Sequence, residues 1–186
     1  MTRILGISGS LRRDSHNTRL LAAAAELLPD DAELTVWTGL RDVPPFDQDD
    51  EAGPPPEAVA ELRDALADAD AVLIATPEYN GSVPGQLKNA LDWASRPHAT
   101  NPLRNLPAAV VGASPGGFGA VWAQADLRRI LARIGARVLD EELAVAHAPQ
   151  RFDESGELSE ADIRDGLEEM IESLVDLARA REAVAA

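Results

Sequence analysis

The stretch AVLIATPEYNGSVPGQLKNALDWAS, residues 71–95, sets out in one unit the organisation that decides the fold. Its first six residues are almost all apolar, as is usual for a strand that is covered on both faces of a sheet. From Leu87 onward, apolar residues recur at the spacing of one helix face. Pro84 stands where the first turn of a helix tolerates a missing N–H. The stretch therefore predicts a strand, a polar loop and a helix in immediate succession.

An apolar run followed by a helix-like segment occurs five times along the 186 residues. The predicted strands lie near residues 3–8, 33–38, 71–76, 107–114 and 137–146. Gly135 is expected to end the fourth helix, and the last helix is expected from about Ser159 to Arg181. Because this alternation gives right-handed crossovers, we predict one α/β domain over residues 1–186 with a parallel sheet. Five such strands usually form a flavodoxin-like, doubly wound sheet of order 2-1-3-4-5 with helices on both faces, although periodicity alone does not fix that order.

Composition excludes several classes of function. The chain has no cysteine, which rules out disulfides, thiol nucleophiles and cysteine metal sites and favours a cytoplasmic location. No apolar run reaches the roughly 18 residues of a membrane-spanning helix, and we expect no signal peptide at the start. The formal net charge of −15 opposes binding to nucleic acids or anionic membranes, which favour a basic face.

The loop after the first predicted strand, SGSLRRDSHNT at residues 8–18, is rich in groups that bind anions. It offers four hydroxyls, one amide, two guanidiniums and a helix N-terminus. Such groups suit a phosphate dianion. The chain has neither G-x-G-x-x-G nor G-x-x-x-x-G-K-[ST], so a dinucleotide or a nucleoside triphosphate is disfavoured and a monophosphate remains. The alternative is a simple turn whose serines only cap the helix.

Two further loops are expected at the same edge of the sheet. In the loop at residues 76–81, Tyr79 can present a ring face, while Glu78 and Asn80 offer polar atoms. Glu78 is equally well placed to be a structural acceptor for loop N–H groups. The sequence GASPGGFGA at residues 112–120 leaves backbone N–H groups open beside a planar heterocycle, unless it is only a flexible connector. A ligand with a phosphate, a polar chain and a flat ring would span all three loops, and FMN has that shape.

GISGSLRRDSHN, ATPEYNGSVPGQLKNALDW and GASPGGFG together resemble the NADPH-dependent FMN reductase family over roughly residues 4–135. This family contains quinone, chromate and azo-dye reductases of flavodoxin-like fold. The resemblance implies that the FMN phosphate is held by Ser10, Arg12, Ser15 and Asn17. It implies contacts to the isoalloxazine ring and ribityl chain from Pro77, Glu78, Tyr79 and Asn80. It places the pyrimidine edge of the ring along Ser114, Gly116 and Gly117.

The resemblance also implies a reaction. NADPH or NADH would pass a hydride to FMN, and a quinone or similar small acceptor would then take the electrons in the same place. One departure leaves the preference for NADPH over NADH open, because relatives often carry an arginine where this chain has Trp122. Members of the family are commonly dimers or tetramers with the flavin near the subunit interface, so we expect a homo-oligomer.

No other catalytic set competes with this reading. The three histidines, His16, His98 and His147, are scattered, so neither a metal site nor an obligatory acid or base is predicted. GISGS lacks the final glycine of a nucleophile elbow, which argues against a serine hydrolase. Two rivals stay open: a non-enzymatic electron carrier of flavodoxin type, and a flavin-free regulatory or scaffold domain.

Helix residues near the second loop allow simpler interpretations. Lys88 and Asp92, four residues apart, are expected to form an ordinary exposed ion pair. Trp93 follows them and belongs either to a subunit interface or to the packing of its own subunit.

Overall fold

The computed structural model describes residues 1–153 and 156–185, without the side chains of residues 182, 184 and 185. The strands are β1 (Thr2–Ser8), β2 (Ala32–Trp37), β3 (Ala71–Ala75), β4 (Pro107–Ala113), β5 (Arg137–Val138) and β6 (Leu143–Val145). The α-helices are α1 (His16–Glu26), α2 (Glu57–Asp68), α3 (Gly85–Ala94), α4 (Val121–Ile134) and α5 (Ala161–Ala185). Four short 3-10 helices are η1 (Gly39–Asp42), η2 (Gln48–Ala52), η3 (His98–Thr100) and η4 (Ala148–Gln150).

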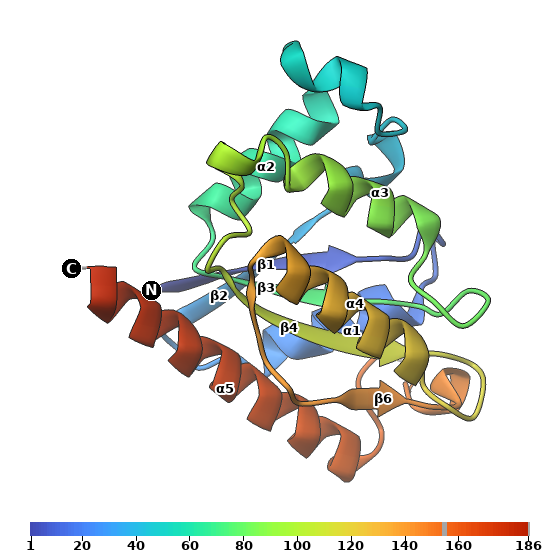
Figure 1. Cartoon of the computed structure of the whole chain (residues 1–186). Coiled ribbons are helices and arrows are strands. Elements are labelled where there is room, and N and C mark those ends of the chain that lie inside the picture. The colour runs from blue at the N-terminus through green and yellow to red at the C-terminus, as the bar shows by residue number, and fades with distance from the viewer. Residues whose placement is uncertain (154–155, 186) are drawn as a thin grey trace.

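The strands form one parallel sheet in the order β2-β1-β3-β4-β5, and β6 also pairs with β4 (Figure 1). The predicted α/β fold and strand order are therefore confirmed. Gly135 ends α4 in the left-handed conformation with φ of 108°, as expected. The last helix begins at Ala161, two residues later than predicted.

The fifth predicted strand differs from the expectation, because the structure divides it into two. β5 and β6 both pair with β4 in parallel, and residues 139–142 lie between them. Asp140, Glu141 and Glu142 are exposed, and three consecutive carboxylates do not suit a paired, half-buried strand. Glu142 instead binds Arg128 of α4, with 2.8 Å between its Oε2 and Nη2 of the arginine. Because apolar residues stand on both sides of this break, the sequence pattern predicted a single strand.

Helices cover both faces of the sheet because its central strands are apolar on both sides. In β3, Val72 and Ile74 pack in the core beneath α2, α3 and α4, while Leu73 packs in the core beneath α1 and α5. β4 alternates in the same way, and every residue of both strands is buried. Two cores that share one sheet hold its carboxyl edge in a fixed position.

Helix α3 anchors the long acidic, proline-rich loop through side chains on one face. Gln86 Nε2 donates to the carbonyls of Leu40 and Val43 at 2.8 Å in each case. Asn89 Nδ2 and Trp93 Nε1 both donate to the carbonyl of Pro44, at 2.8 Å and 2.9 Å. Trp93 is only 4% exposed, so it packs within its own subunit rather than at an interface. These polar residues of the second motif therefore have a structural task.

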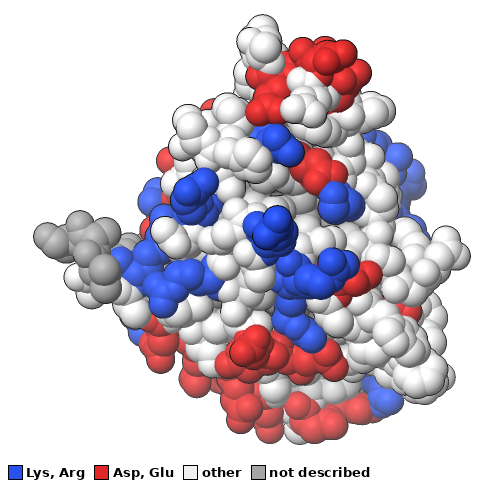
Figure 2. Space-filling view, viewed as in Figure 1, with Lys and Arg blue, Asp and Glu red and all other residues white. Residues whose placement is uncertain are grey.

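Charge is unevenly distributed over the surface. On the face shown in Figure 2, acidic side chains gather at the top and along the bottom, and most of the basic side chains lie between them. Lys88 and Asp92 form the expected ion pair at 2.6 Å. The net charge of −15 thus does not describe every part of the surface. No helix in the described part of the chain is both long and apolar enough to cross a membrane.

Candidate functional site

The first loop, residues 9–15, connects β1 to the N-terminus of α1. Ser15 caps the helix, because its Oγ accepts a hydrogen bond from the N–H of Asn17 at 3.2 Å. Ser10 is half-buried and its Oγ accepts from the N–H of Arg12, whose side chain is exposed. The N–H groups of His16 and Thr18 have no acceptor among the described residues. These two donors leave the helix N-terminus open to an anion.

Asn17 connects the first loop to the end of β4. Its Nδ2 donates to the carbonyl of Ala113 at 3.0 Å, and its Oδ1 accepts from the N–H of the same residue at 2.9 Å. The side chain is buried, so this paired bond fixes α1 against β4. Asn17 was predicted to contact phosphate, and both polar atoms of its side chain are already bonded to the backbone of Ala113.

A close approach also ties the first loop to β3. The N–H of Gly9 donates to the carbonyl of Ala75 at 2.8 Å. A Cβ atom at position 9 would lie 2.8 Å from Leu87 Cδ2 and 3.2 Å from Pro77 Cδ, so only glycine fits there without movement. The ends of β1, β3 and β4 are thus joined by direct hydrogen bonds rather than merely neighbouring one another.

The second loop reverses direction through a tight turn. Asn80 and Gly81 have φ values of 54° and 74°, and Tyr79 and Ser82 pair across them. Two positive φ values in succession explain why Asn-Gly stands here. Tyr79 projects outward and is 49% exposed.

The second loop is fastened to α4 at two places. Glu78 Oε2 accepts from the backbone N–H groups of Trp122 and Ala123, at 3.1 Å in both cases. Ser82 Oγ lies 2.7 Å from Asp126 Oδ2. That hydrogen bond, and then one from Arg129, lower the pKa of Asp126 below its ordinary value. The structural alternative for Glu78 is therefore realised, since its carboxylate caps a helix that lacks a capping side chain of its own.

The third loop, residues 114–120, is held against the segment that follows β6. His147 N–H donates to the carbonyl of Gly116, and Ala148 N–H donates to the carbonyl of Ser114, both at 3.0 Å. Gly119 has φ of 57° and passes so close to Ala144 that a Cβ there would lie 2.5 Å from a backbone carbon. Residues 115–118 nevertheless remain exposed. The loop is thus fastened at its ends and open along its middle.

His16 begins α1 beside the first loop and stacks on Phe152, with 6.0 Å between the ring centroids. Burial lowers the pKa of His16 below its ordinary value of 6.5, and the positive charges of Arg19 and Arg12 lower it further. Its Nδ1 is buried without a partner in the described part of the chain. The imidazole is therefore neutral in the folded protein near neutral pH.

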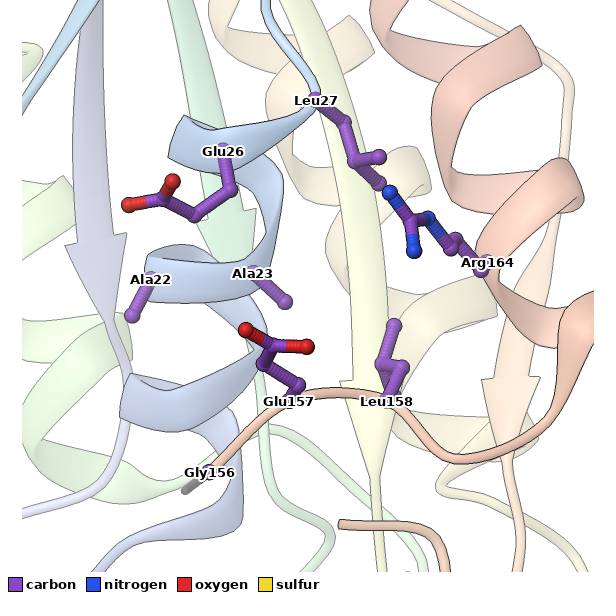
Figure 3. Close-up of a pocket in the computed structure, with 8 residues that line it drawn as sticks. All are labelled: Ala22, Ala23, Glu26, Leu27, Gly156, Glu157, Leu158 and Arg164. Carbon is purple, nitrogen blue, oxygen red and sulfur yellow. The ribbon is translucent and has the colours of Figure 1, made fainter. Parts of the chain in front are cut away.

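One hollow in the surface of the described residues lies away from this edge of the sheet. It measures about 430 Å³ and lies between α1 and the segment leading to α5 (Figure 3). Its lining comprises Ala22, Ala23, Glu26, Leu27, Gly156, Glu157, Leu158 and Arg164, and so includes none of the predicted site residues. A smaller hollow of about 160 Å³ does include Ser10 and Arg12. The predicted site is an open edge formed by loops, and no metal-ligand cluster occurs among the described residues.

Sequence reasoning missed one residue at this edge. His147 follows β6 closely, and its ring lies beside Gly117 of the third loop. Apolar periodicity carries no information about such a position. The rule that parallel strands end at one edge would have found it, because β6 is parallel to β4.

The fold defines a flavodoxin-like α/β protein, and these loops form a candidate ligand site at the carboxyl edge of its sheet. The family model for NADPH-dependent FMN reductase matches residues 2–150. The chain is 39% identical over 173 residues to an NAD(P)H-dependent FMN reductase of Pseudomonas aeruginosa, covering 92% of each protein. It is 37% identical over 180 residues to a 2-hydroxy-1,4-benzoquinone reductase of Burkholderia sp, covering 96% of this chain and 97% of that one.

Among solved structures, the flavoenzyme NAD(P)H:(acceptor) oxidoreductase FerB of Paracoccus denitrificans superposes with a TM-score of 0.87 at 35% identity. The superposition covers 97% of this chain and 98% of FerB. The chain belongs to the NADPH-dependent FMN reductase family. The predicted resemblance is confirmed, and relatives of this kind favour an enzyme over a non-enzymatic electron carrier.

Proposed function

We propose that this protein binds FMN at the carboxyl edge of its sheet and passes electrons from NADPH or NADH to a quinone or a similar small acceptor. The observation that carries the proposal is the joining of three loops at one edge. Gly9 is bonded to Ala75, and Asn17 to Ala113, so the loops after β1, β3 and β4 have fixed positions. Family membership supplies the cofactor and the class of reaction.

The N-terminus of α1 fits the phosphate group of FMN. The free N–H groups of His16 and Thr18, the hydroxyl of Ser10 and the exposed guanidinium of Arg12 are the kinds of donor that a phosphate dianion requires. The N-terminus of α4 offers no such donors, because Glu78 occupies the N–H groups of Trp122 and Ala123. Phosphate is therefore assigned to α1, with Ser10, Arg12 and Ser15 in its shell and Asn17 beside them.

The second and third loops fit a flat ring with a polar edge. Pro77, Glu78, Tyr79 and Asn80 would border the ring and the ribityl chain, and Ser114, Gly116 and Gly117 the pyrimidine edge. The turn at Asn80 and Gly81 keeps Tyr79 directed outward, and the middle of the third loop is open. When bound, FMN supplies the hydride chemistry, so the protein has to bind it, orient it and leave one ring face accessible.

A homo-oligomer, either a dimer or a tetramer, is part of the proposal. The rim of the site carries an apolar surface that a single subunit leaves uncovered. Tyr79, Phe118 and Trp122 are 49%, 66% and 50% exposed, and the rings of the last two lie 4.9 Å apart. Contiguous exposed aromatic residues are typical of protein interfaces. Light scattering combined with size-exclusion chromatography measures the mass that decides this point.

The proposal is tested with the purified protein. We expect flavin absorption bands, or saturable binding of added FMN, and oxidation of NADPH or NADH that accelerates when a benzoquinone is added. Oxidation of neither nicotinamide would contradict the proposed enzyme and favour an electron carrier. A colourless protein that binds no added FMN would contradict the cofactor as well, and would favour the flavin-free domain.

A further inference from the structure

His147 has a backbone conformation that residues other than glycine seldom adopt. Its φ and ψ are 52° and 39°, in the left-handed region. Non-glycine residues in this region are uncommon, although histidine is among the more frequent of them. Three backbone hydrogen bonds surround it: its own N–H to Gly116, the N–H of Ala148 to Ser114, and the N–H of Gln150 to its carbonyl. The segment is therefore fixed at the third loop, and a strained residue held in this way often has a function.

The His147 ring lies over the part of the third loop that has no side chains. Its Cε1 and Nε2 atoms are 3.8 Å from the place that a Cβ of Gly117 would occupy. His147 is exposed, and neither ring nitrogen has a hydrogen-bond partner within residues 1–153 and 156–185. An imidazole with a free N–H thus stands at the open middle of the loop.

Of the neighbouring polar side chains, Glu78 offers no donor, while Ser114 keeps the hydrogen of its hydroxyl to donate beside His147. The carboxylate of Glu78 accepts hydrogen bonds and is already bound to α4. Ser114 Oγ accepts from the N–H of Gly116 at 3.2 Å. The backbone bonds around His147 would form equally well with glycine or asparagine, which suit the left-handed conformation better. The fold at this point therefore does not require an imidazole.

We propose that the His147 imidazole donates a hydrogen bond to the pyrimidine edge of bound FMN and so favours the reduced cofactor over the oxidised one. This inference rests on the proposed function, which assigns that edge to Ser114, Gly116 and Gly117. Reduction increases the negative charge at the pyrimidine edge, and a hydrogen bond to a charged acceptor is stronger than one to a neutral acceptor. The residue acts by direct contact with the cofactor, and it need not exchange a proton.

The test compares His147→Asn with His98→Asn, a change at an exposed histidine in η3, away from the strand ends. The affinity of each FMN-free protein for oxidised and for reduced FMN is measured under anaerobic conditions. For His147→Asn we expect reduced FMN to bind about tenfold more weakly, the equivalent of one charge-assisted hydrogen bond, with a much smaller change for oxidised FMN. For His98→Asn we expect neither affinity to change.

A second measurement does not depend on the variant's affinity. When FMN is added to the FMN-free wild-type protein, the ring proton resonances of His147 should shift in the NMR spectrum, while those of His98 stay in place. Equal losses for both FMN states in His147→Asn, no loss in either, or an unshifted His147 resonance would overturn the inference. If the wild-type protein itself bound no FMN, the proposed function would fail first, and the two failures are thereby distinguished.

Discussion

Glu78 Oε2 accepts hydrogen bonds from the backbone N–H groups of Trp122 and Ala123 at 3.1 Å, so a carboxylate from the loop after β3 caps helix α4. Residue Ala120, just before that helix, has φ of 63° and provides no capping side chain. One acidic residue therefore stabilises a helix N-terminus and fixes the orientation of the loop that would border the flavin ring.

Replacing Glu78 should affect both the stability of the fold and the binding of FMN. Glu78→Ala leaves two N–H groups of α4 without an acceptor, and we expect a loss of about 1–3 kcal/mol in the free energy of unfolding. Urea denaturation measures this loss, and fluorescence titration measures the weaker binding of FMN. Glu78→Gln retains an acceptor oxygen and should lose less. Glu172→Ala, a change at an exposed glutamate of α5, is the control and should lose little. A Glu78→Ala protein as stable as wild type would contradict the capping role.

Substitutions of the neighbouring residues Arg12 and Arg13 distinguish direct binding of the phosphate from long-range electrostatic attraction. Both are exposed, but only Arg12 belongs to the proposed phosphate shell. We expect Arg12→Gln to weaken FMN binding by about tenfold, the effect of removing one charge-assisted hydrogen bond. Arg13→Gln should have little effect. Riboflavin, which lacks the phosphate, should bind both variants like wild type. Equal effects of the two substitutions on FMN would mean that long-range attraction, rather than contact, is at work.

Substitution of Trp93 tests how much its contact with the long loop stabilises the fold, and substitution of Trp122 is the control. Trp93→Phe removes the hydrogen bond to Pro44 and alters the edge-to-face contact with Phe46, whose ring centroid lies 5.0 Å away. We expect a loss of about 1 kcal/mol in stability, the net contribution of one hydrogen bond, because the Pro44 carbonyl still accepts from Asn89 Nδ2. Trp122→Phe keeps an aromatic ring at a position exposed in the single subunit, and it should cost under about 0.5 kcal/mol in the free energy of unfolding when measured at a protein concentration at which subunits are dissociated. Similar losses for both variants would show that the Pro44 contact contributes little.

His16 should make the stability of the FMN-free protein depend on pH. Its pKa is lower in the folded protein than the ordinary value of 6.5, so the unfolded chain takes up the proton first as the pH falls. The stability present at neutral pH is therefore lost as the pH drops below 6.5 toward the folded value. The His16→Gln variant should lack this loss, whereas His98→Gln should retain it. Urea denaturation across this pH range gives the comparison, and parallel curves for wild type and His16→Gln would contradict the assignment.

Much of the fold could be predicted because its central strands are buried on both faces. β3 and β4 read as continuous apolar runs, and the alternation of strands with helices indicated a parallel sheet. The strand order itself came from analogy with flavodoxin-like folds. The split between β5 and β6 could not be predicted, since the apolar residues on either side of residues 139–142 concealed it. Local propensity gave the helix end at Gly135 correctly, but placed the start of α5 two residues early.

The candidate site was predictable as a place and less so in its details. The three loops lie together because parallel strands end at a common edge. The partners of individual side chains depend on tertiary contacts that sequence spacing does not contain. Glu78 could therefore be read either as a ligand contact or as a cap, and Trp93 either as an interface residue or as core. His147 was not predicted to belong to the site for the same reason, because only the fold brings its ring next to Gly117.

The division between β5 and β6 has a consequence for how copies of this protein can associate. An uninterrupted outermost strand would present a row of unpaired backbone groups on which another chain could add a strand. Here the ladder is broken by residues 139–142, which carry three exposed carboxylates. Continuation of the sheet from one molecule into the next is thereby discouraged on this side, so that an oligomer formed across this edge would depend on contacts between side chains.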